Sequence, residues 1–221
     1  MSLWDEKRAE RYLRLYQDPR SKKGTQSILC KDATEFIVGP GVADIACGVG
    51  HLVPHLLEKF KDLEYVGIDS SPAMLKRAKA FFPEEMFIEM DATDIDLGLF
   101  GRKGQRINTA AALSLFIHLS KEEMIKVLQE MKLLAKTAIV FGMETVDDTE
   151  VVRGDGIRIR NQSVQSVIDT LKELGFDEKK ILHYHQSYTY QDIHTLIPSR
   201  EIPLSSSRDL IARTTLFQVM I

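Results

Sequence analysis

The sequence predicts an α/β fold built on a doubly wound sheet of seven strands, mostly parallel with an antiparallel last strand, behind an N-terminal helical cap. Two observations carry this prediction. From about residue 40 to residue 180, short apolar segments typical of strands alternate with amphipathic helical segments, the pattern of a parallel sheet with helices on both faces. The last two predicted strands have no helix between them, so we expect an antiparallel pair at one edge.

Length and composition agree with one domain of this kind. A chain of 221 residues, 44% hydrophobic and 28% charged, can bury one full core. We therefore expect a single domain over 1–221, with the helical cap over 1–38 and a cofactor-binding core over 39–221. No apolar run reaches the ~18 residues that span a bilayer, and residues 1–10 lack the apolar core of a signal peptide. These features predict a cytoplasmic protein without a membrane partner.

Charge and cysteine content argue against several other classes. The net charge is −3, whereas a nucleic-acid binder usually carries a basic excess, so a nucleic-acid partner is not expected. Cys30 and Cys47 form neither a disulfide framework nor a Cys-x-x-Cys pair, and no metal site is expected. The sequence gives no information on oligomeric state.

The elements follow from periodicity. Ala9, Tyr12, Leu13 and Tyr16 recur at helical spacing and predict a first helix, which ends near 18–19. A second helix is predicted over 26–36. Strands are predicted over 42–46, 65–68, 86–90, 107–115, 137–144, 181–190 and 211–220. Helices are predicted over 50–60 and 72–82, from 120 onward, and from 164 to a stop at Gly175, and the glycine-rich segment 98–104 is read as a loop.

Two of these helices carry clear start signals. Ser71 followed by Pro72 is typical of a capping residue and a first helical position. Ser120 with Glu123 three residues later predicts a capping box, in which each side chain binds the backbone N–H of the other residue.

The stretch Ala43-Asp44-Ile45-Ala46-Cys47-Gly48-Val49-Gly50 contains the end of the first core strand and, after it, a loop of small residues with glycines at 48 and 50. Glycines in such a strand–loop–helix let the backbone come close to a ligand. The first three strands end in carboxylates, Asp44, Asp69 and Asp91, which lie 25 and 22 residues apart, about one strand–helix unit each. Because parallel strands end at the same edge, these acids should form a row there, suited to a ligand with hydroxyls and cationic groups.

Two common phosphate ligands fit poorly. The dinucleotide fingerprint needs a third Gly or Ala where this chain has Val53, and the acid at Asp44 is unfavourable near a pyrophosphate. A P-loop is excluded because no Gly-Lys-Ser/Thr follows. The better ligand carries an amine and a sulfonium and no phosphate.

These residues resemble the class I S-adenosylmethionine-dependent methyltransferases, which have a Rossmann-like fold. Asp44-x-Ala46-x-Gly48-x-Gly50 is similar to their first motif, and Asp69-Ser70-Ser71-Pro72-Ala73-Met74-Leu75 to their second. Asp91-Ala92 resembles the third and 115–119 the fourth. The resemblance covers roughly residues 40–221. Ala46 departs from the glycine of the first motif, a change we expect to be tolerated if its φ is negative.

The resemblance implies S-adenosyl-L-methionine as cofactor and S-adenosyl-L-homocysteine as product. It implies that Asp69 accepts hydrogen bonds from the ribose hydroxyls, Asp91 from the adenine amino group, and that Asp44 lies near the amine of the cofactor. The implied cofactor-binding residues are Asp44, Ala46, Cys47, Gly48, Gly50, Asp69, Ser70, Met74, Asp91, Ala92, Leu113 and Ser114.

Candidate catalytic and acceptor-binding residues are fewer. A base is needed only if the acceptor keeps its proton at neutral pH; His118, after the fourth core strand, and Glu144, ending the fifth, are the candidates. Tyr12, Tyr16 and Arg158 are candidate acceptor-binding residues. The expected function is methyl transfer to an oxygen, nitrogen or sulfur atom of a small molecule. RNA or protein methylation, and non-catalytic binding of the cofactor, are the alternatives.

Overall fold

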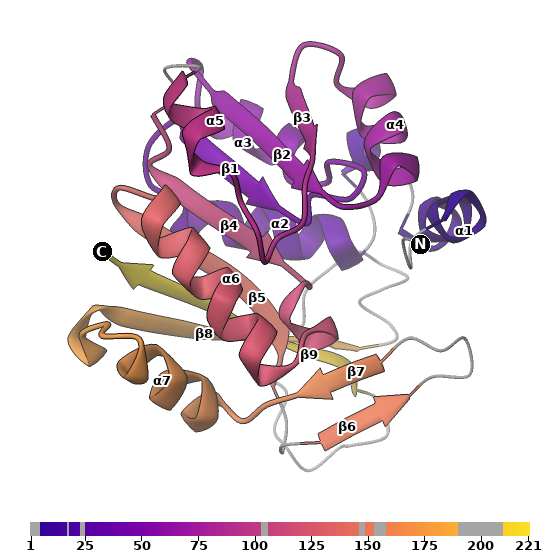
Figure 1. Ribbon diagram of the computed structural model, residues 1–221. Helices are drawn as coiled ribbons and strands as arrows, with labels where there is room; N and C mark the ends of the chain where they lie inside the picture. Colours follow the sequence, from indigo (N-terminus) through magenta and orange to yellow (C-terminus); the bar gives the residue numbers. More distant parts are fainter. Residues whose placement is uncertain are drawn as a thin grey trace.

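A computed structural model describes residues 5–16, 18–22, 25–102, 106–145, 149–152, 158–189 and 210–221 (Figure 1). Its main feature is one seven-stranded sheet with the order β3-β2-β1-β4-β5-β9-β8. No helix within the described ranges is long and apolar enough to cross a membrane.

The sheet confirms the predicted fold class. Strands β1 to β5 pair in parallel, and the last strand, β9, lies antiparallel between β5 and β8. Strand order reverses between β1 and β4, because β1 pairs with β2 on one side and with β4 on the other. The strands are β1 Gly41–Ile45, β2 Glu64–Asp69, β3 Met86–Glu89, β4 Thr109–Leu113, β5 Ala138–Glu144, β8 Ile181–Thr189 and β9 Leu210–Met220.

Helices cover both faces of the sheet. The larger core cluster packs α5, α6 and α7 against one face, and a second cluster packs α2, α3 and α4 against the other. Alternation along β1 explains the division, because Ala43 and Ile45 belong to the first cluster and Val42 to the second. The helices are α1 Glu6–Tyr16, α2 Thr25–Phe36, α3 Val53–Lys59, α4 Pro72–Phe81, α5 Leu97–Arg102, α6 Lys121–Leu134 and α7 Val164–Glu173.

Both predicted start signals are confirmed. The Ser71 hydroxyl accepts from the backbone N–H of Met74 at 3.2 Å, with Pro72 in the first turn of α4. Ser120 and Glu123 form the capping box of α6, in which the Glu123 carboxylate accepts from the Ser120 N–H at 2.7 Å. Each cap satisfies backbone donors that a helix leaves without an internal partner.

Four local expectations were wrong or incomplete. The glycine-rich segment 98–104 is not all loop, since α5 covers Leu97–Arg102, where Leu97, Leu99 and Phe100 pack on the larger cluster. Strand β4 is shorter than predicted. The helix expected from 50 begins at Val53, because Gly48 and Gly50 have positive φ. A hairpin of β6 (Thr149–Val152) and β7 (Arg158–Asn161) was not predicted.

Candidate active site

The glycine loop, residues 46–52, joins β1 to α3 at the point where strand order reverses. Open α/β sheets bind ligands at such a switch point, beyond the carboxyl ends of the strands. Gly48 has a φ of 56°, and a Cβ added there would meet nothing within 4 Å. Gly50 has a φ of 86°, and its Cβ would press on the ring of Phe82 at 3.1 Å. The loop thus needs Gly50 for packing, whereas at Gly48 it presents bare backbone to open space.

Asp69, at the end of β2, holds the glycine loop in place. Its Oδ2 accepts from the backbone N–H of Gly48 at 2.9 Å, and its Oδ1 accepts from the N–H of Ser71 at 2.8 Å. Burial raises the pKa of this carboxyl, against the lowering effect of the two backbone donors. A carboxylate has about four acceptor positions. Two therefore serve the fold, and the others are chemically able to accept ligand hydroxyls.

Asp44 is 4% exposed and accepts a hydrogen bond from the hydroxyl of Tyr65 at 2.9 Å. Burial, together with the charge of Asp69, raises the pKa of Asp44 to about 7, although the Tyr65 hydrogen bond opposes the rise. A cation brought close to this carboxyl would favour its ionised form. The sequence analysis did not identify Tyr65 as a site residue. Tyr65 lies on β2 two residues before Gly67, the register partner of Asp44, so its side chain is on the same face of the sheet as that position.

Cys47 is a packed loop residue. Its backbone N–H bonds the carbonyl of Ile68 at 3.0 Å, and its sulfur would lie 2.8 Å from a Cβ on Gly67. Burial raises the pKa of the Cys47 thiol well above its usual value, and the neighbouring Asp44 and Asp69 add to the effect. A thiol in this environment is a poor nucleophile.

Two residues other than glycine adopt the left-handed conformation at the switch point. Ala46, after β1, has a φ of 60°, and Ser114, after β4, has a φ of 62°. The condition on which alanine was expected to be tolerated, a negative φ at Ala46, is therefore not met: the loop keeps its glycine-type backbone even with alanine there. Strained backbone of this kind tends to gather at functional sites. Leu113, beside Ser114, is buried in the core cluster of α2 and α3.

The remaining cofactor candidates spread along the strand ends. Ser70 is exposed, and Met74 is buried against α1. Asp91 is exposed, and its Oδ1 accepts from both the N–H and the hydroxyl of Thr93, at 2.8 and 2.7 Å. Ala92 packs on the edge of the larger core cluster. Asp91 thus closes a local turn and still presents its carboxyl to the surface.

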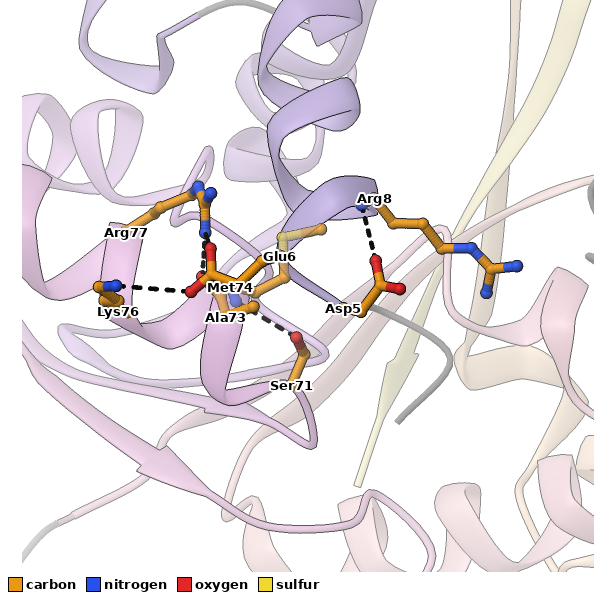
Figure 2. Close-up of polar contacts among 8 residues, drawn as sticks. All are labelled: Asp5, Glu6, Arg8, Ser71, Ala73, Met74, Lys76 and Arg77. Carbon is orange, nitrogen blue, oxygen red and sulfur yellow. Dashed lines mark hydrogen bonds and ion pairs between the residues drawn. The ribbon is translucent and has the colours of Figure 1, made fainter. Parts of the chain in front are cut away.

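Helix α1 lies beside α4 (Figure 1) and is held there by polar and apolar contacts. Figure 2 shows the Glu6 carboxylate between Arg77, at 2.7 Å, and Lys76, at 3.5 Å. Ala9, fully buried, packs in a cluster with Val49, Ala73 and Met74. Because Val49 lies between the two glycines, α1 covers one side of the glycine loop.

The candidate base His118 ends a short 3-10 helix, Phe116–His118, that follows β4. The hairpin lies against this turn, and the Arg160 guanidinium of β7 approaches the carbonyl of His118 at 3.4 Å. Glu144 ends β5 opposite Thr214 of β9. Tyr12 belongs to α1 and lies 5.8 Å from the ring of His51. The Tyr16 and Arg158 side chains lie outside the described part of the chain.

The sheet order and the glycine loop at its switch point define a Rossmann-like domain. Residues 42–137 match the family model described as a methyltransferase domain. Over these residues the chain is similar to methyltransferase domains, in agreement with the resemblance to the class I S-adenosylmethionine-dependent methyltransferases.

Three known proteins illustrate the likeness. The chain is 35% identical over 82 residues to trans-aconitate 2-methyltransferase of Rhodopseudomonas palustris (strain HaA2), and this stretch is 37% of the chain and 30% of that relative. The fold resembles magnesium protoporphyrin IX methyltransferase from Synechocystis PCC 6803 with bound S-adenosylhomocysteine (TM-score 0.65, 16% identity, 98% and 95% of the two chains). It also resembles an S-adenosylmethionine-dependent methyltransferase from Clostridium acetobutylicum ATCC 824 (TM-score 0.61, 12% identity, 97% and 98%).

Proposed function

We propose that this protein transfers a methyl group from S-adenosylmethionine to an oxygen, nitrogen or sulfur atom of a small molecule. The observation that carries the proposal is the glycine loop, whose bare backbone at Gly48 faces open space at the switch point. A phosphate ligand fits poorly beside the buried Asp44, whereas a cofactor with an amine and a sulfonium suits carboxylates at the ends of β1 and β2.

The residues present can hold such a cofactor. Backbone at Ala46, Gly48 and Gly50 would receive its amino-acid part, with Asp44 close to the amine. Asp69 has acceptor positions beyond the two that bind Gly48 and Ser71, and these would take ribose hydroxyls. Ser70, Met74, Asp91 and Ala92 would surround the adenine, and Leu113 and Ser114 would close the methionine side.

The bound cofactor supplies a methyl group on a sulfur that is already activated. The chain therefore has to align the acceptor in line with that methyl and to keep water out. Helix α1 and the β6–β7 hairpin are the segments suited to both tasks, because one covers the glycine loop and the other lies against the turn after β4. His118 on that turn would take the proton from an acceptor that still holds one, and Glu144 is the second candidate.

A small acceptor is favoured over a polymer. The net charge of −3 gives no general attraction to nucleic acid. The relative from Rhodopseudomonas palustris is named for trans-aconitate, a small carboxylate. Carboxylates are accordingly the first acceptor class to try, with Tyr12, Tyr16 and Arg158 as candidate contacts.

The test has two stages. Calorimetry first measures the binding of S-adenosylhomocysteine to the purified protein. Formation of S-adenosylhomocysteine from S-adenosylmethionine is then measured with panels of small carboxylates, amines, thiols and phenols, and with bulk RNA. Turnover with a small acceptor supports the proposal. Turnover with RNA alone would replace it, and tight cofactor binding with no turnover on any acceptor would favour a non-catalytic binding protein.

A further inference from the structure

His51 is a buried polar side chain of the glycine loop. It follows Gly50 directly and is 3% exposed. Neither Nδ1 nor Nε2 has a hydrogen-bond partner among the described residues. A neutral imidazole has one donor and one acceptor, and each costs about 1–3 kcal/mol when buried without a partner. If His51 served only packing, an apolar side chain in its place would give a larger free energy of unfolding. The buried imidazole is therefore better explained by a ligand that binds its ring nitrogens.

Its polar neighbours have other partners. Asp18, whose charge acts on the imidazole, bonds the backbone and the guanidinium of Arg20, at 2.9 and 2.6 Å. His55 bonds the Ser27 hydroxyl at 2.9 Å. The ring of Tyr12 lies 5.8 Å away and tilted by 58°. The imidazole thus lies between the glycine loop and α1, and within the described ranges both of its ring nitrogens are without a hydrogen-bond partner.

The kind of ligand follows from charge. Burial lowers the pKa of His51 to about 4, and His55 acts in the same direction. The imidazole is therefore neutral at physiological pH and offers one N–H. A carboxylate would accept this N–H, and its charge would favour the imidazolium, in which both ring nitrogens are donors. An ammonium would use only the acceptor nitrogen and would disfavour the imidazolium, and a sulfonium has no N–H or O–H to donate to it.

We propose that His51 is a cofactor-binding residue whose imidazole N–H donates a hydrogen bond to the amino-acid carboxylate of S-adenosylmethionine. This assignment rests on the proposed function. It places the one anionic group of the cofactor next to Gly50, where the loop backbone would receive its amino-acid part, and under Tyr12 of α1. It also gives α1 a role in cofactor binding, since Tyr12 of this helix lies beside the imidazole that would bind the carboxylate.

The test compares a ligand that has the amino-acid end of the cofactor with one that lacks it. S-adenosylhomocysteine carries the amino-acid carboxylate, whereas 5′-methylthioadenosine lacks the whole amino-acid end. We expect H51F to weaken the affinity for S-adenosylhomocysteine about tenfold or more. The affinity for 5′-methylthioadenosine should change by less than about twofold. H51Q, which keeps an N–H donor, should recover part of the loss. The unliganded H51F protein should unfold at a higher temperature than the wild type, because two unused polar atoms are removed.

The matched control is H55F. His55 is also buried, one helical turn further along, but it already has Ser27 as its partner. H55F should lower thermal stability and change the affinities for both ligands by the same factor. An equal effect of H51F on both ligands, or no effect on either, overturns the proposal.

A wild-type measurement needs no variant. Titration of the His51 ring by NMR should give a higher pKa with S-adenosylhomocysteine bound than with 5′-methylthioadenosine bound, with Asp18, His55 and Tyr12 unchanged as neighbours. Equal values would contradict the assignment. A wild type that fails to bind S-adenosylhomocysteine overturns the proposed function, and the role of His51 with it. If the wild type binds S-adenosylhomocysteine and H51F binds it equally well, only the role of His51 is overturned. A carboxylate of the methyl acceptor is then the next ligand to test.

Discussion

The carboxylate of Asp69 and the backbone N–H of Gly48 form a hydrogen bond of 2.9 Å that joins the end of β2 to the glycine loop of β1. The other carboxylate oxygen binds the N–H of Ser71, the capping residue of α4. One side chain therefore sets the position of two segments that line the candidate site. This relationship explains how an acid at the end of the second strand can shape the site before any ligand arrives.

Asp69→Ala should weaken the binding of S-adenosylhomocysteine by about 1.5–3 kcal/mol, the size of hydrogen bonds to a charged group. Loss of the Gly48 and Ser71 contacts should also lower the free energy of unfolding. Calorimetry and urea denaturation measure the two effects. Glu89→Ala is the matched control, since Glu89 is the register partner of Asp69 on β3 and is exposed. An Asp69→Ala protein with wild-type affinity would refute the placement of the ribose.

Ala46→Gly should raise the free energy of unfolding by about 1 kcal/mol, because the left-handed conformation disfavours a Cβ by roughly that amount. The φ of 60° at Ala46 is the reason. Affinity for S-adenosylhomocysteine should stay within about twofold, as the backbone path is unchanged. Ala43→Gly, in the regular part of β1, should instead be destabilising. A destabilised Ala46→Gly protein would show that the alanine methyl contributes more packing than strain.

Asp44→Asn should stabilise the protein at high pH more than at low pH. The ordinary pKa of an Asp is 3.8, and the folded value is about 7. Between these values the folded state keeps a proton that the unfolded state releases, so wild-type stability falls as the pH rises through this window and is lowest above pH 7. A difference of about three pKa units corresponds to an upper bound of about 4 kcal/mol.

Denaturation curves at pH 4.5 and pH 8 measure this effect. The free energy of unfolding of the Asp44→Asn protein should exceed that of the wild type most at pH 8. Tyr65→Phe removes the hydrogen-bond donor to Asp44 and should therefore lose the most stability at pH 8. An equal difference in the free energy of unfolding between variant and wild type at both pH values would mean that the pKa of Asp44 is not raised.

His118→Ala should lower kcat at least tenfold with cofactor affinity retained, if the acceptor keeps its proton at neutral pH. The His118 carbonyl, which Arg160 approaches, is preserved by this change. Single-turnover kinetics together with calorimetry separate the rate from binding. A wild-type rate would dismiss His118 as the base, and Glu144→Gln is then the next variant to measure.

Periodicity and capping signals were enough to predict the sheet. The Ser71 and Ser120 caps, the parallel strands and the antiparallel last strand all follow from short-range patterns in the sequence. The one-domain organisation remains a prediction. Sequence reasoning missed α5, because its glycines hid an apolar face that packs on the core. It also missed the β6–β7 hairpin.

For the site, the sequence located the glycine loop and the row of carboxylates but not their partners. The bonds of Asp69 to Gly48 and of Asp44 to Tyr65 join separate strands, and no local pattern reports such a pairing. The positive φ of Ala46 was unforeseen because residue type favours the opposite. That the His51 ring nitrogens are buried without a partner in the described part of the chain depends on the folded arrangement around them, which includes Tyr12 of α1, and no local pattern indicates it.

The most direct test of the account is a titration of S-adenosylhomocysteine into the wild type and into Gly48→Ala, followed by calorimetry. A Cβ at Gly48 meets nothing within 4 Å, so the variant should fold with only the modest strain of a φ of 56°. The same methyl group would occupy the space into which the loop backbone presents itself. We predict that the wild type binds and that Gly48→Ala loses at least about tenfold in affinity. Equal affinity of the two proteins, or no binding by the wild type, would contradict the account.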